Sequence, residues 1–64
     1  MLTTETIIQY DQPIEVTKKQ YCFAMSQFQS LVAGKQDEFG KYYIKVWTTN
    51  PKYINLIKNY LLQI

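Results

Sequence analysis

The chain has 64 residues, a formal net charge of +2 and a hydrophobic fraction of 47%, a composition typical of a folded domain. It contains no histidine and a single cysteine, Cys22, which excludes an intramolecular disulfide and leaves no set of zinc ligands. A domain of this length buries only about 60% of the surface that its unfolded chain exposes. We therefore expect one marginally stable domain over residues 1–64, supported by self-association or by a partner.

The charged residues are distributed unevenly along the chain. The first 16 residues hold three acids and no lysine, whereas all seven lysines lie in residues 17–64 beside two acids. Arginine is missing, which disfavours sequence-specific DNA readout because arginine is the preferred residue for bidentate guanine contacts. The N-terminus has no signal-peptide pattern, and the longest apolar run, residues 21–25, is too short to span a bilayer. We expect a cytoplasmic protein without a membrane partner.

The first predicted element is a strand over residues 3–10, which are rich in β-branched and aromatic types. Residues 11–13, with the sequence Asp-Gln-Pro, end it. Residues 14–16 form a short extended piece, and a second strand folding back on the first is the alternative for them.

The first helix begins at the best defined boundary of the chain. Thr17 and Gln20 have the spacing of a capping box, in which each side chain accepts a hydrogen bond from a backbone N–H group of the other residue. Apolar side chains then follow at helical spacing: Tyr21, Met25, Phe28 and Val32. Gly34 supplies a left-handed C-cap, so the helix is predicted to reach Val32, with a polar loop over residues 35–40.

Residues 41–48 alternate strictly and predict a strand. One face of this strand takes Tyr42, Ile44 and Val46, and the other takes Lys41, Tyr43, Lys45 and Trp47. Asn50 and Pro51 then have the pattern of an N-cap followed by the first residue of a second helix. The apolar residues of that helix cover well over half of its circumference, which indicates an association face formed by Tyr53, Leu56, Tyr60 and Ile64.

These elements predict an α+β fold with a small two- or three-stranded sheet and two helices, in the order β-(β)-α-β-α. So few strands leave exposed sheet edges that invite pairing with another chain.

The sequence contains none of the residue patterns that we associate with a catalytic site. Ser26 and Ser30 have no base near them in the sequence, and Cys22 is expected to be a small buried hydrophobe. Asp37 and Glu38 are adjacent in a loop, and neither glycine belongs to a phosphate-binding pattern. We expect no enzyme activity, no cofactor, no metal and no small-molecule substrate.

The second face of the predicted strand over residues 41–48 is the candidate binding surface, because its aromatic rings are interleaved with lysines. Such a face stacks bases and neutralises phosphates in nucleic-acid-binding platforms, and it also suits a protein–protein hot spot. A third alternative is that the last helix covers Tyr43 and Trp47 while the lysines extend outward. Phe23, on the polar side of the first helix, joins the candidate residues if it lies beside either ring.

The sequence thus predicts a small interaction protein that binds a larger protein or a nucleic-acid-processing complex, with inhibition of that target as one outcome. Its length and its composition, rich in lysine, isoleucine and tyrosine, resemble those of small accessory proteins of phages and mobile elements from AT-rich hosts. That resemblance implies stoichiometric binding to a host enzyme or defence complex in the host cytoplasm. Two alternatives stay open: a nucleic-acid-binding module that uses the Lys/Tyr/Trp face, and a structural homodimeric subunit.

Overall fold

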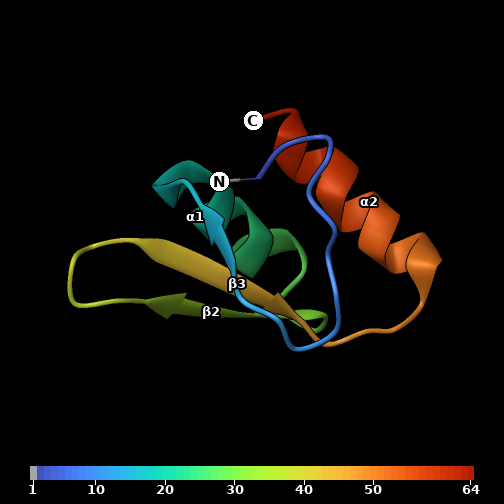
Figure 1. Ribbon diagram of the computed structural model, residues 1–64, viewed down its shortest axis with the longest axis horizontal. Coiled ribbons are helices and arrows are strands. Elements are labelled where there is room, and N and C mark those ends of the chain that lie inside the picture. Colours follow the sequence, from blue (N-terminus) through green and yellow to red (C-terminus); the bar gives the residue numbers. More distant parts are fainter. Residues whose placement is uncertain (1) are drawn as a thin grey trace.

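The computed structural model describes residues 2–64, so Met1 of the domain predicted over residues 1–64 lies outside the described part (Figure 1). The elements are, in chain order, β1 (Ile14–Val16), α1 (Lys18–Gln27), β2 (Val32–Gln36), β3 (Tyr42–Val46) and α2 (Pro51–Leu62). Three strands in one sheet and two helices confirm the predicted α+β class, and the chain order roughly matches the prediction.

The sheet has the order β1-β3-β2, and β3 pairs antiparallel with both neighbours. Ile44 at the centre of β3 is aligned with Ile14 of β1 and with Gly34 of β2. Residues aligned in this way point to the same side of a sheet, and their chain neighbours point to the other side. Both helices cover the side of Ile44, and β1 and β2 form the two edges (Figure 1).

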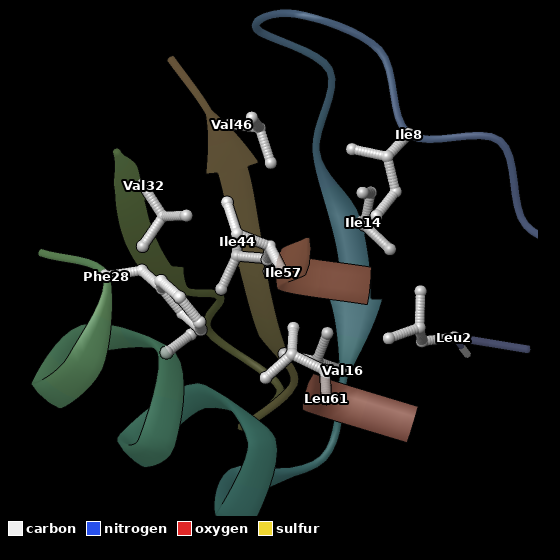
Figure 2. Close-up of a cluster of buried hydrophobic side chains, with 11 residues drawn as sticks. Leu2, Ile8, Ile14, Val16, Phe28, Val32, Ile44, Val46, Ile57 and Leu61 are labelled. Atoms are coloured by element: carbon white, nitrogen blue, oxygen red, sulfur yellow. The ribbon is translucent and has the colours of Figure 1, made fainter. Parts of the chain in front are cut away.

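The hydrophobic core lies between the sheet and the two helices. Figure 2 shows Phe28, Ile57 and Leu61 gathered with Ile44 and Val46 of the central strand. Two residues of the N-terminal segment, which we define as residues 2–13, complete it: Leu2 and Ile8 are buried. Every part of the chain therefore contributes apolar surface to one small core, as a domain of this length requires.

The predicted strand over residues 3–10 is wrong. A turn forms at its start, where the Thr6 N–H donates to Thr3 O at 3.1 Å and the two threonine hydroxyls lie 3.3 Å apart. Threonine hydroxyls offer the backbone local hydrogen bonds that compete with a sheet. Tyr10 alone makes a β-bridge, which is parallel and joins it to Val46. Residues 14–16 are a strand, but they pair with β3 and not with the N-terminal segment.

The start of α1 is confirmed and its predicted end is wrong. Thr17 and Gln20 exchange both hydrogen bonds of a capping box, at 3.1 and 2.9 Å. The helix ends at Gln27, however, and the chain turns at Phe28, whose carbonyl accepts the N–H groups of Leu31 and Val32. Residues 29–31 form a turn where the last helical turn is predicted, and Val32 begins β2, which extends into the start of the predicted 35–40 loop.

Gly34 is a strand residue and not a helix C-cap. It lies beneath Tyr21 and Met25 of α1, and a Cβ atom at this position would fall on the Tyr21 ring and 2.8 Å from Met25 Sδ. The missing side chain thus lets α1 approach the sheet closely. The left-handed glycine of this region is Gly40, with φ 82°, in the turn between β2 and β3.

The predicted strand within residues 41–48 and the predicted start of the last helix are confirmed. In β3, Ile44 and Val46 are fully buried on the helix side, and Tyr42 packs beside them. The Asn50 side chain caps α2 by accepting the Lys52 N–H at 3.0 Å, and Pro51 is the first helical residue.

Candidate functional site

The side of the sheet opposite the helices carries the predicted binding residues of β3. Tyr43 and Lys45 alternate with Ile44 and Val46, so their side chains point away from the core. Trp47 continues this face and is 44% exposed. The alternative in which the second helix covers Tyr43 and Trp47 is therefore wrong, because both helices pack on the other side.

We call this surface the open sheet face. It comprises Lys41, Tyr43, Lys45 and Trp47, their strand neighbours Glu15, Ala33 and Lys35, and Asp11 of the N-terminal segment, and Tyr10 borders it through the contact of its ring with Trp47.

An exposed aromatic pair stands at one end of the open sheet face. The rings of Tyr10 and Trp47 meet edge to face, with centroids 5.8 Å apart and an interplanar angle of 76°. Tyr10 is half exposed, and its bridge to Val46 holds it beside the next residue of the chain, Trp47. Sequence reasoning did not select Tyr10, since only the path of the N-terminal segment through space brings it to this face.

The lysines of the open sheet face are matched by carboxylates. Lys45 Nζ lies 3.6 Å from Asp11 Oδ1, and Lys41 Nζ lies 4.0 Å from Glu15 Oε1. Lys35 lines an open depression of about 310 Å³ together with Pro13, Asp37, Tyr43 and Lys45. Three lysines and three carboxylates, Asp37 of the adjacent β2–β3 turn among them, thus lie on or beside this face, and their formal charges cancel.

The structure separates Phe23 from the other predicted binding residues. Its ring stacks on Tyr60 of α2 at a centroid distance of 6.1 Å and meets Phe28 edge to face at 6.4 Å. These neighbours belong to the helical layer, so Phe23 lies on the opposite side of the sheet from Tyr43 and Trp47.

The predicted association residues of α2 form a second exposed surface. Tyr53, Leu56, Tyr60 and Ile64 are each 39–46% exposed, while Ile57 and Leu61 of the same helix are fully buried. At 100° per residue Tyr53, Leu56 and Tyr60 fall within an arc of about 60° on one flank of the helix, and Ile64 lies just beyond its end at Leu62. That flank faces α1, because Tyr60 contacts Phe23 and Phe28. We call Phe23 and these four residues the helix patch.

The described part of the chain offers few groups for thiol chemistry, metal binding or membrane insertion. Cys22 is exposed, so the prediction of a buried cysteine is wrong. Residues 2–64 hold no group of three or more His, Cys, Asp or Glu side chains that could bind a metal ion. Of the two helices found there, neither is long and apolar enough to cross a membrane.

Comparison with protein families, with curated proteins and with solved structures finds no match for this chain.

Proposed function

We propose that the chain is a non-enzymatic interaction protein that binds a larger protein through the open sheet face. The observation that carries the proposal is the exposed Trp47–Tyr10 pair on a sheet side without a helix. Tryptophan and tyrosine are the residues most enriched in protein–protein hot spots, where a well-packed aromatic anchor supplies much of the binding energy.

The surroundings of the pair also fit a protein partner. Tyr43 offers a further aromatic ring beside the Trp47–Tyr10 pair. Lys35 and Lys45 border a depression large enough to take a side chain of the partner. Protein interfaces combine such an anchor with a polar rim that pairs across the boundary. Lysine stems add apolar contact area while their ammonium groups remain in water.

Nucleic-acid binding is the weaker alternative for this surface. Phosphate binding by lysines draws its free energy from the neutralisation of an anionic backbone. On the open sheet face Lys41 and Lys45 already pair with Glu15 and Asp11, and Asp37 beside the face offsets the charge of Lys35. A phosphate would have to compete with these carboxylates, whereas a protein partner requires no net positive charge.

The composition extends the proposal to the class of partner. The composition, rich in lysine, isoleucine and tyrosine and without arginine or histidine, resembles that of small accessory proteins of phages and mobile elements, which often act by stoichiometric binding. We therefore propose a cytoplasmic host enzyme or a nucleic-acid-processing defence complex as the target, inhibited where the bound protein covers its working surface.

The test compares the proteins that immobilised parent and variants retain from cell extract. The double variant Tyr43→Ala/Trp47→Ala removes two rings of the open sheet face. Phe39→Ala is the matched control, because Phe39 is an exposed aromatic residue of the β2–β3 turn and belongs to neither the open sheet face nor the helix patch. We expect a partner captured by the parent to be lost by the double variant and retained by the control, with equal helicity of all three by circular dichroism.

Two results would contradict the proposal. One is a partner that survives the double substitution but is lost with Tyr53→Ala on α2, which would assign binding to the helices. The other is quenching of Trp47 fluorescence by single-stranded oligonucleotides at low salt, reversed steeply as salt rises, which would favour the nucleic-acid alternative.

A further inference from the structure

We propose that the helix patch is a homodimer interface in which α2 packs antiparallel against α2 of a second copy. This inference is independent of the proposed function, because the helix patch and the open sheet face lie on opposite sides of the sheet. Three properties of α2 indicate that a second copy of the chain covers the patch. They are the order of its exposed side chains, its lack of acidic residues and the position of Lys52.

The exposed side chains alternate between aromatic and aliphatic in the order Tyr53, Leu56, Tyr60, Ile64. An antiparallel copy centred at residue 58 sets Leu56 against the partner's Tyr60 at 1.5 Å per residue, and it brings Tyr53 to the C-terminal end of the partner's α2, which Ile64 follows. Each ring then meets a branched aliphatic side chain. A parallel copy would set each residue against itself.

The charges of α2 favour the same arrangement. Lys52 lies in the first turn, where the helix dipole is positive, and α2 has no acidic residue in that turn and no basic residue in its last turn. Antiparallel packing brings each Lys52 to the C-terminal end of the partner's helix, where a cation is stabilised. Parallel packing would bring the two Lys52 side chains and the two positive helix ends together.

Apart from Lys52, the rim of the patch on α2 carries no charge, which also favours a second copy over a strongly charged partner. The neighbouring exposed residues of α2 are amides, Asn55, Asn59 and Gln63. Of these, Asn59 lies near the two-fold axis of the antiparallel pair, where its amide can pair with its own copy because it offers both a donor and an acceptor. An isologous interface of this kind uses the same surface twice.

The exposed area predicts a weak and reversible dimer. The four side chains of α2 are each about 40% exposed, which corresponds to roughly 300 Å² of apolar surface per copy. With Phe23 and the amide rim, two copies bury on the order of 1,000 Å², at the lower limit of specific interfaces. We therefore expect a dissociation constant on the order of 10 μM.

The experiment is sedimentation equilibrium of the full chain over roughly a hundredfold range of concentration around that dissociation constant. The parent should shift from 7.6 kDa toward twice that mass. Leu56→Asp places a charge at the centre of the patch and should remain monomeric throughout. Phe39→Asp is the matched control: Phe39 is 80% exposed in the β2–β3 turn, far from α2, and the variant should dimerise as the parent does.

A second variant tests the antiparallel orientation of the two helices separately from the folding of the monomer. Lys52→Glu places a negative charge at the N-terminus of its own helix, which stabilises the monomer. In the antiparallel dimer the same charge lies at the partner's helix C-terminus, so the dissociation constant should rise roughly fivefold over the two symmetric contacts. A parent that stays monomeric at the highest concentration overturns the proposal, as does a Leu56→Asp variant that still dimerises. Tighter dimerisation of Lys52→Glu overturns the antiparallel arrangement.

Discussion

At the scale of single residues, Gln20 is the clearest case of a side chain with two structural roles. It is the only buried polar residue in residues 2–64, and its Oε1 accepts the Thr17 N–H to close the capping box of α1. Its Nε2 donates to the Leu61 carbonyl at 3.0 Å, near the end of α2. One amide thus satisfies a free donor at the start of one helix and contacts a carbonyl in the last turn of the other.

This double role gives Gln20→Glu an unexpected sign. In an isolated helix the substitution is favourable, because glutamate completes a capping box equally well and an acid stabilises a helix N-terminus. Here the introduced carboxylate loses the donor for Leu61 O and faces that carbonyl in a buried site. We expect a loss of about 1–3 kcal/mol in the free energy of unfolding, measured by urea denaturation followed by circular dichroism.

The matched control for this measurement is Gln12→Glu, the same change at an exposed position outside both helices, which should alter the free energy of unfolding by less than about 0.5 kcal/mol. The deficit of Gln20→Glu should also shrink at low pH, where a protonated carboxyl can again donate to Leu61 O. An equal or higher stability of Gln20→Glu at neutral pH would show that the bond to α2 contributes nothing.

At the scale of elements, the sequence predicts those boundaries that local chemistry determines. The capping box of Thr17 and Gln20, the Asn50–Pro51 start of α2 and the alternation of β3 each need only a few neighbouring residues. The end of α1 needs more. Val32 is four residues after Phe28 and fits a helical stripe, yet it fits β2 equally well because it then lies opposite Val46.

The candidate site is likewise predictable from the sequence only in part. Alternation predicts that Tyr43, Lys45 and Trp47 share one face, but it does not predict which face the helices leave open. That depends on both helices packing against Ile44 and Val46. The sequence does not predict the position of Tyr10 for a related reason. Tyr10 lies beside Trp47 because of the path of the N-terminal segment, which pairs with β3 only at Tyr10.

The N-terminal segment is nevertheless part of the core, and two adjacent isoleucines test this directly. Ile8 is 7% exposed and packs in the core cluster, whereas Ile7 is 78% exposed. Ile8→Ala should lower the free energy of unfolding by about 2–4 kcal/mol, because it removes buried apolar contacts and leaves a cavity. Ile7→Ala should change it by less than about 0.5 kcal/mol. Equal effects in urea denaturation would mean that the segment does not pack as described.

At the scale of the whole molecule, the arrangement leaves one core between two exposed surfaces. The open sheet face lies on one side of the sheet, and the helix patch lies in the helical layer on the other. A dimer formed through the helix patch would leave the open sheet face of each copy free, so the assembly could bind two copies of a partner or two sites on one partner. Such bivalency raises avidity without any new contact.

Dimerisation through the helix patch also predicts how stability depends on concentration. A small domain is only marginally stable, and association of the native state alone adds stability by mass action. Above the dissociation constant, each tenfold rise in protein concentration should add about 0.7 kcal/mol per chain, or roughly 3–5 °C in Tm for a domain of this size. Thermal unfolding of the parent at several concentrations measures this shift.

Two variants serve as controls for this measurement. Leu56→Asp should show no shift in Tm, whereas Trp47→Ala should keep the full shift because Trp47 lies on the open sheet face. A Tm that is independent of concentration in the parent, or a shift lost in Trp47→Ala, would mean that the helix patch is not what joins the two copies.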